Sequence, residues 1–401
     1  MAGNVEMESS AAGSGAAGDT LERVRDIAAT ITDAAAEAER DRRLPDHLMA
    51  ALHDAGLFRL LLPAPYGGAE MDPPALFEVM EAVAKLDAST AWCLGQANGC
   101  AMSAAYLEPA VADEIWGRDP AAVLAWGPGK AQAVCEGDGY RVTGAWSFAS
   151  GGRNATWFGG HSTVMEADGK PRRRADGTVA IRTMLFPVAQ ATMTEMWDVI
   201  GLLGTGSDGF TVSDLYVPHD HSFAREDAAE RRHDTPLYQF PAVSLFAVAF
   251  AAVAVGIARP MLDSFKDLAA AKRPRLTHNV LRDDALVQAE VARSEARLGA
   301  ARAYLRSEID DIWRAVVASG RLTVEQRMRI RLASTHAIHE ARAVADSAYE
   351  MAGASAIFTS GPFERRFRDM HTVAQQLQGR AANFQTVGAF LFGHPPDLTV
   401  A

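Results

Sequence analysis

The chain has 401 residues and a formal net charge of -11, and 48% of its residues are hydrophobic while 22% are charged. This length exceeds what one hydrophobic core usually organises, so two or three domains are expected. The acidic balance argues against a protein that wraps nucleic acid or coats an anionic membrane, and it favours a small-molecule or protein partner.

The cysteines, the N-terminal residues and one apolar run indicate the cellular compartment in which the protein works. The three cysteines show no CxxC spacing, which predicts neither a disulfide framework nor a zinc site and fits a reducing cytoplasm. Residues 1–18 are small and polar, and they predict a disordered tail rather than a signal peptide. The uncharged run 242–258 is short for a membrane span, so we expect a buried helix there and no membrane partner.

The first part of the chain, residues 19–120, predicts an N-terminal α-helical domain. Leu21, Val24 and Ile27 recur at helical spacing after Asp19, which is a suitable N-cap. Further helical patterns follow, and a Pro- and Gly-rich loop at 57–70 interrupts them.

The middle part, residues 121–232, predicts a central antiparallel, barrel-like β domain. Short segments rich in strand-forming residues alternate with turn signals, and the sequence EGDG at 136–139 suits a hairpin turn.

The last part, residues 233–395, predicts a four-helix bundle. Helical patterns near 242–271, 283–318, 323–352 and 362–390 are long enough to form one. The domain order is therefore helical, β, helical.

Two motifs suggest familiar sites, and neither has the required context. Residues 204–209 match GxGxxG, but a strand pattern follows where a dinucleotide-binding turn needs a helix. His219 with His221, and His336 with His339, have metal-like spacings without a convincing third ligand, so no metal is predicted.

Two other residues carry reactive groups in suggestive places. His371 lies among Arg and Asp residues in the stretch 353–380, where it could transfer a proton or could simply be a hydrogen-bonded core histidine. Ser150 ends a strand beside glycine, where it could bind a flat ligand or could satisfy its own turn.

Four segments together resemble the acyl-CoA dehydrogenase superfamily: LFRLLLPAPYGGAE, GYRVTGAWSFASGG, GLLGTGSDGFTVSDLYVP and MAGASAIFTSGPFERRFRDMH. The resemblance spans roughly residues 20–395. It implies a helical domain, a central β domain against which a flavin ring lies, and a C-terminal four-helix bundle, in the order found above.

The end of the chain separates two branches of this superfamily. Acyl-CoA dehydrogenases carry a glutamate base where Leu377 stands here, whereas His371 follows Arg368 and Asp369 as in the flavin-dependent monooxygenase branch. That branch contains 4-hydroxyphenylacetate and steroid-ring hydroxylases and dibenzothiophene monooxygenase. Many of its members have arginine in place of Leu203, which leaves one phosphate or substrate contact in doubt.

The resemblance implies the oxygenase component of a two-component monooxygenase. Reduced FMN or FAD would come from a separate flavin reductase and react with O2 to a C4a-hydroperoxyflavin, which hydroxylates a small aromatic or polycyclic substrate. Ser150 would hold flavin N5, and His371 would hold the peroxide or deprotonate a phenol. The implied cofactor-binding residues are Trp146, Phe148, Ala149, Ser150, Gly151, Thr205, Ser207, Arg275 and Arg282, and the implied substrate-binding residues are Trp92, Asn98 and His371.

Three alternatives remain open from the sequence. These are an FAD-dependent acyl-CoA dehydrogenase with a relocated base, a relative that oxygenates nitrogen or sulfur, and a non-catalytic scaffold of the same fold. The resemblance also implies a homotetramer built as a dimer of dimers.

Overall fold

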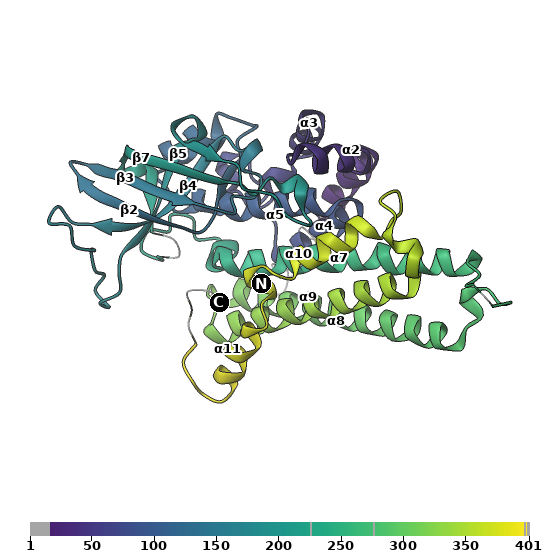
Figure 1. Ribbon diagram of the computed structural model, residues 1–401. Helices are drawn as coiled ribbons and strands as arrows, with labels where there is room; N and C mark the ends of the chain where they lie inside the picture. Colours follow the sequence, from purple (N-terminus) through teal and green to yellow (C-terminus); the bar gives the residue numbers. More distant parts are fainter. Residues whose placement is uncertain (1–16, 225–226, 276, 397, 399–401) are drawn as a thin grey trace.

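The structure is a computed structural model that describes residues 17–224, 227–275, 277–396 and 398. A twisted sheet lies at one end, a helical bundle extends from it, and the N-terminal helices sit against both (Figure 1). Residues 17–26 are helical, so the first helix begins before Asp19 and the predicted N-cap is wrong. The predicted disordered tail, 1–18, is wrong at residues 17 and 18, which belong to this helix, and residues 1–16 lie outside the described residues.

Two of the N-terminal helices, α4 and α5, are capped by aspartate side chains at their starts. The Asp72 side chain accepts the amide of Ala75 at the start of α4, and Asp87 accepts the amide of Thr90 at the start of α5. Helix α5 is buried almost all round, as a helix between two layers must be. The helices of this part are α2 (Ala28–Asp41), α3 (Asp46–Asp54), α4 (Pro73–Leu86), α5 (Ala88–Ala101) and α6 (Pro109–Ala112).

Within the described residues the central sheet has eight strands, seven of them in the order β6-β7-β3-β2-β4-β5-β8, while β1 pairs with β4. The predicted hairpin is confirmed, because Glu136 pairs with Gly139 and Gly137 takes a φ of 59° in the turn. The strands are β1 (Leu124–Trp126), β2 (Gly129–Glu136), β3 (Gly139–Trp146), β4 (Trp157–Met165), β5 (Ile181–Pro187), β6 (Thr192–Thr194), β7 (Gly209–Pro218) and β8 (Ser222–Phe223).

The sheet is mixed, which corrects the prediction of a purely antiparallel domain. Strands β1 and β2 both pair with β4 in parallel. A parallel pair needs a long return connection, and between β2 and β4 the chain makes it through β3 and the segment 147–156. That segment carries Ser150.

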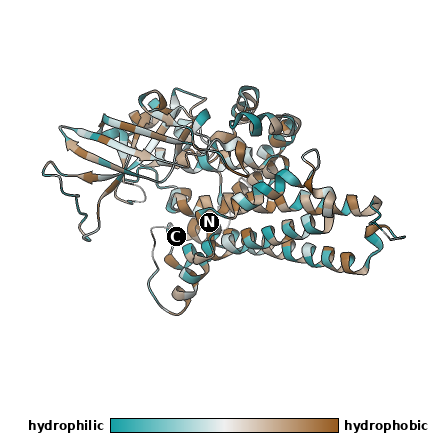
Figure 2. Ribbon diagram, viewed as in Figure 1, coloured by the Kyte–Doolittle hydropathy of each residue, from teal (hydrophilic) through white to brown (hydrophobic). Residues whose placement is uncertain are grey.

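The bundle contains α7 (Ala242–Ala271), α8 (Ala285–Ser319), α9 (Val324–Ala352) and α10 (Glu364–Val373), followed by α11 (Ala382–Leu391). Helix α7 is long and apolar enough to cross a membrane, yet 89% of its most apolar window is buried within the structure. Hydrophilic residues are frequent along α8 at the outer edge of the bundle (Figure 2).

The last predicted helix, 362–390, is broken. Helix α10 ends at Val373, a short 3-10 turn η12 (Leu377–Gly379) follows, and α11 begins at Ala382. The break is held by side chains from α9, because the Thr335 hydroxyl donates to the Gln378 carbonyl and a nitrogen of His339 lies 2.8 Å from the Gly379 carbonyl.

Candidate active site

Two backbone segments meet where β3 ends and where β7 begins. The Ala149 amide donates to the Asp208 carbonyl at 3.0 Å, and the Gly151 amide donates to the Thr205 carbonyl at 2.8 Å. Gly151 has a φ of 74°, a left-handed conformation that glycine adopts without strain. Ser150 is thereby fixed between the sheet and the N-terminal helices.

The Ser150 hydroxyl belongs to a connected row of polar side chains. Its Oγ lies 2.7 Å from Ser207 Oγ, which in turn lies 2.7 Å from Thr205 Oγ1. From α5, the Trp92 indole Nε1 donates to Ser150 Oγ at 3.0 Å, and its ring stacks on Phe250 of α7 with centroids 3.8 Å apart. All three hydroxyl-bearing residues are buried.

Asp208 holds the turn that carries Ser207. Its carboxylate accepts the amides of Met196 and Trp197 and the Arg153 Nε at 2.5 Å. Burial disfavours the charge of this carboxyl, yet the donors from Arg153 and the two amides keep its pKa below the ordinary value.

Asp369 of α10 holds the other end of the same turn. Its Oδ1 accepts the Leu202 amide at 2.6 Å, and Leu202 has a φ of 53°, which costs free energy in a residue other than glycine. Burial raises the pKa of Asp369 to about 7, and the nearby Asp87 carboxyl raises it as well.

Next to Ser150 lies an exposed apolar surface. Phe148 is 55% exposed, and its backbone has a φ of 59°. Its ring meets the Trp197 ring edge-on, with the ring centroids 6.1 Å apart. Met196 and Ile200 are exposed beside this turn as well. An exposed aromatic ring beside a buried hydroxyl fits a flat heteroaromatic ring whose polar edge reaches Ser150, so these residues fit a flavin.

The structure brings most of the predicted residues together. Phe148, Ala149, Ser150 and Gly151 lie on one side of the junction, Thr205 and Ser207 on the other, and Trp92 above them on α5.

Two predicted contact residues are structural instead. Trp146 is 1% exposed, stacks on Phe210 in the β core and donates Nε1 to the His161 carbonyl, so it cannot touch a cofactor. Asn98 is fully buried, and its amide bonds the backbone of Leu57, Leu60, Leu61 and Leu94. Both predicted contacts are corrected, because no polar atom of either side chain remains available.

His371 faces away from Ser150. Its Nε2 lies 2.8 Å from Asp346 Oδ1 of α9, and its ring packs on Phe367. Residues two apart on an α-helix point about 200° apart, so His371 lies on the opposite side of α10 from Asp369, which bonds the Leu202 turn. The contacts of His371 within the described chain are with Asp346 and Phe367 and do not include the Ser150 group.

Arg275 and Arg282 lie beyond the far end of α7. Phe250 marks the level of Trp92 on this helix, and the helix continues to Ala271 before it reaches the arginines. At 1.5 Å per residue this is roughly 30 Å, as the extended bundle shows (Figure 1). Within one chain these arginines do not join the Ser150 group.

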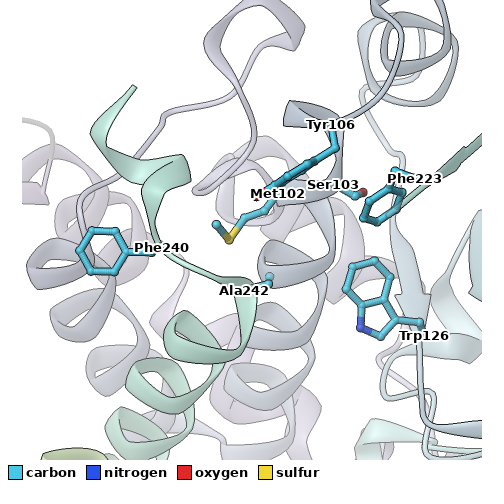
Figure 3. A pocket seen from close by; sticks show the side chains of 8 residues that line it. Met102, Ser103, Tyr106, Trp126, Phe223, Phe240 and Ala242 are labelled. Atoms are coloured by element: carbon cyan, nitrogen blue, oxygen red, sulfur yellow. The ribbon is translucent and has the colours of Figure 1, made fainter. Parts of the chain in front are cut away.

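A small hollow of about 10 Å³ opens further along α5, lined by Gly99, Met102, Ser103, Tyr106, Trp126, Phe223, Phe240 and Ala242. Trp126 and Phe223 lie on one side of the hollow and Phe240 on the other, with Met102 and Ala242 between them (Figure 3). Gly99 is seven residues from Trp92, two helical turns along the same face of α5. The hollow and the Ser150 group thus lie along one helix face.

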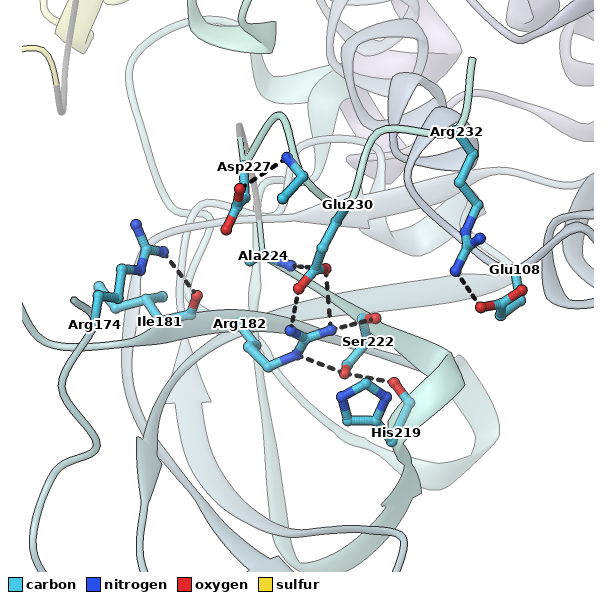
Figure 4. Close-up of polar contacts among 11 residues, drawn as sticks. Glu108, Arg174, Ile181, Arg182, His219, Ser222, Ala224, Asp227, Glu230 and Arg232 are labelled. Carbon is cyan, nitrogen blue, oxygen red and sulfur yellow. Dashed lines mark hydrogen bonds and ion pairs between the residues drawn. The ribbon is translucent and has the colours of Figure 1, made fainter. Parts of the chain in front are cut away.

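The segment that follows β8 is tied down beside this hollow. Arg182 of β5 binds both carboxylate oxygens of Glu230 and also contacts Ser222 (Figure 4). Arg232 pairs with Glu108, and its amide donates to the Ala105 carbonyl. These bonds hold the neighbouring Phe223 ring against the hollow.

The sequence did not indicate that the Asp208 and Asp369 carboxylates anchor the backbone turns of this site. Asp369 was noted as part of an Arg-Asp pair, and Asp208 as part of a Gly-rich motif, but no pattern indicated which amides they accept. Across the described ranges, no three His, Cys, Asp or Glu side chains gather where they could hold a metal ion.

Comparisons with known proteins agree with this architecture. Residues 18–109 match the acyl-CoA dehydrogenase N-terminal domain, and residues 248–378 match the acyl-CoA dehydrogenase C-terminal domain. The chain is similar to indole-3-acetate monooxygenase of Pseudomonas putida, with 32% identity over 362 residues that cover 90% of each chain. It is also similar to the FADH(2)-dependent resorcinol hydroxylase, oxygenase component, of a Rhizobium species, with 26% identity and 92% coverage of each.

A solved structure supports the same assignment. The HsaA monooxygenase from Mycobacterium tuberculosis superposes with a TM-score of 0.86 at 27% identity, covering 96% of this chain and all of that one. The chain therefore belongs to the acyl-CoA dehydrogenase superfamily, in its group of flavin-dependent monooxygenases.

Proposed function

We propose that the protein is the oxygenase component of a two-component flavin-dependent monooxygenase that oxygenates a small aromatic substrate. The observation that carries the proposal is the buried Ser150 hydroxyl beside the exposed Phe148 ring, at the junction of the β domain and α5. Relatives named as monooxygenases and as an oxygenase component support the same reaction class.

The chain's own residues divide the work of the site. Phe148 offers a face for the flavin ring, and Ser150 offers an oxygen at the ring's N5 edge. When bound, reduced flavin supplies the two electrons that activate oxygen. The N-terminal helices and α7 cover this edge with Trp92 and Phe250, which exclude water from it.

The hollow along α5 marks the proposed substrate site. Its lining offers aromatic faces from Tyr106, Trp126, Phe223 and Phe240 and no charged side chain, which favours a flat apolar ring, and these side chains must move apart to admit one because the hollow measures about 10 Å³. Indole-3-acetate and resorcinol, the compounds in the relatives' names, both contain such a ring.

The dehydrogenase alternative needs a carboxylate base at the flavin. By the resemblance, the position of that glutamate base is occupied here by Leu377, which has no carboxylate. The carboxylates that hold the Ser150 turn, Asp208 and Asp369, are buried and already accept backbone amides. Neither is placed to remove a substrate proton.

A two-step mixing experiment tests the proposal. Protein is mixed without oxygen with reduced FMN or FAD, and then with oxygen and a panel of indoles, phenols and aryl sulfides. We expect a transient absorbing species that outlives the oxidation of free flavin, followed by an oxygenated product. Immediate peroxide release at the rate of free flavin would refute the proposal, and flavin bleaching by an acyl-CoA would select the dehydrogenase.

We also infer a separate flavin reductase and a homotetramer in a reducing compartment such as the cytoplasm. The resemblance supports the tetramer, and so do the exposed apolar side chains Leu391 and Phe392 at α11 and Ile357 and Phe358 before α10. Light scattering on the purified protein tests it, because a monomer at micromolar concentration would contradict the inference.

A further inference from the structure

The row of hydroxyl groups formed by Ser150, Ser207 and Thr205 ends at a carbonyl oxygen, which can only accept a hydrogen bond. Thr205 Oγ1 lies 2.7 Å from the Leu202 carbonyl oxygen, and a carbonyl has no hydrogen to donate. The next two contacts, Thr205 to Ser207 and Ser207 to Ser150, are also 2.7 Å long. Three short oxygen-oxygen contacts therefore share the three hydrogens of three hydroxyl groups.

This count leaves one arrangement of the hydrogens. Thr205 must donate to the Leu202 carbonyl, so Ser207 must donate to Thr205, and Ser150 must donate to Ser207. Any other arrangement leaves two oxygens 2.7 Å apart without a hydrogen between them, which is repulsive. The row therefore has a fixed direction, and it begins at Ser150.

The direction decides what Ser150 can offer a ligand. Its hydrogen is used by Ser207, and one of its two lone pairs accepts the Trp92 Nε1 hydrogen. The second lone pair has no partner among the described residues. Ser150 thus faces its ligand as an acceptor of a hydrogen bond.

We propose that the hydroxyl row from Thr205 through Ser207 makes Ser150 an acceptor and thereby selects reduced over oxidised flavin. Reduced flavin carries a hydrogen on N5 and can donate to Ser150, whereas N5 of oxidised flavin has a lone pair that needs a donor. The inference rests on the proposed function, which places N5 at Ser150. Thr205 and Ser207 then act as specificity-determining residues.

The backbone around the row keeps its end in place. The Leu202 carbonyl also accepts the Trp197 Nε1 at 3.0 Å, and the Leu202 amide is held by Asp369. Loss of the Thr205 hydroxyl therefore leaves the carbonyl bonded and the turn anchored. Such a change alters the direction of the row more than it alters the fold.

The test measures the dissociation constants of oxidised and reduced FMN and FAD by fluorescence, the reduced forms without oxygen. We expect wild type to bind the reduced form at least tenfold more tightly. Thr205→Val frees the Ser207 hydrogen to turn toward Ser150, and Ser207→Ala removes the acceptor of the Ser150 hydrogen. Each variant should reduce the preference for reduced over oxidised flavin about tenfold, because about one hydrogen bond is lost. A tenfold loss of this preference lowers the two-electron reduction potential of the bound flavin by about 30 mV.

A control variant and the binding of flavin by wild type distinguish a failure of the hydroxyl row's selectivity from a failure of the proposed function. Thr205→Ser keeps a hydroxyl and should keep the preference, and circular dichroism with an unfolding midpoint shows whether each variant is folded. If wild type binds flavin and both disruptive variants keep its preference, the selection by the row is refuted and the proposed function stands. If wild type binds neither form of either flavin, the proposed function itself fails.

Discussion

Asp369 makes a testable link between the buried site and pH. Its carboxyl is 3% exposed, and burial raises its pKa from an ordinary value near 3.8 to about 7. Because the folded state holds the proton more tightly than the unfolded chain, this group stabilises the fold at low pH. The stabilisation is complete below pH 3.8 and is lost as the pH rises to about 7.

The size of the effect follows from the two pKa values. Between them, stability falls by about 1.4 kcal/mol per pH unit, since the unfolded carboxyl is ionised while the folded one is protonated. Lowering the pH from 8 to 6 should therefore stabilise wild type by about 1.4 kcal/mol through this group. Asp369→Asn keeps an oxygen for the Leu202 amide but cannot titrate, so it should lack this gain.

Urea unfolding of both proteins from pH 5.5 to 8, at one protein concentration, measures the difference. Every other titrating group is common to the two chains, so subtracting the variant's profile from that of wild type isolates Asp369. We expect wild type to gain relative to the variant as the pH falls below 7. Parallel profiles would show that the buried carboxyl stays ionised and would refute the reasoning.

Three further substitutions test separate parts of the site. His371→Ala should destabilise the protein by about 1 kcal/mol through the lost contact with α9 and leave product coupling unchanged, whereas increased peroxide release would restore the predicted catalytic role. Phe148→Gly should relieve the left-handed backbone without loss of stability and weaken flavin binding, and unchanged flavin affinity would place the ring elsewhere. Arg182→Met leaves the Glu230 carboxylate without its partner, so amide hydrogen exchange at Ala224 should speed up while exchange in α9 stays unchanged.

Much of the fold could be predicted because its signals are local. The uncharged run 242–258 became the buried half of α7, and the EGDG turn became the hairpin between β2 and β3. Helical spacing and turn chemistry act within a few residues, so a single chain displays them directly. The resemblance added the flavin, and the comparisons with known proteins confirmed the family.

Other features depend on contacts between distant segments. No residue near Asn98 in the sequence indicates that its amide group forms hydrogen bonds with the loop at 57–61. Likewise, no residue near His371 indicates that its ring contacts Asp346. The break after α10 likewise depends on side chains from α9. Hydrogen-bond partners such as these are chosen by packing, which sequence spacing does not encode.

Ser150 shows where the two kinds of information meet. The sequence alone placed a serine beside glycine after a strand-forming segment, in a chain that resembles flavin enzymes, although β3 ends at Trp146 and Ser150 lies in the turn beyond it. Only the tertiary structure placed Ser207, Thr205 and the Leu202 carbonyl in one row with it. The direction of a hydrogen bond depends on every group to which its partners are bonded, so the role of Ser150 as donor or acceptor was decided by residues more than fifty positions away.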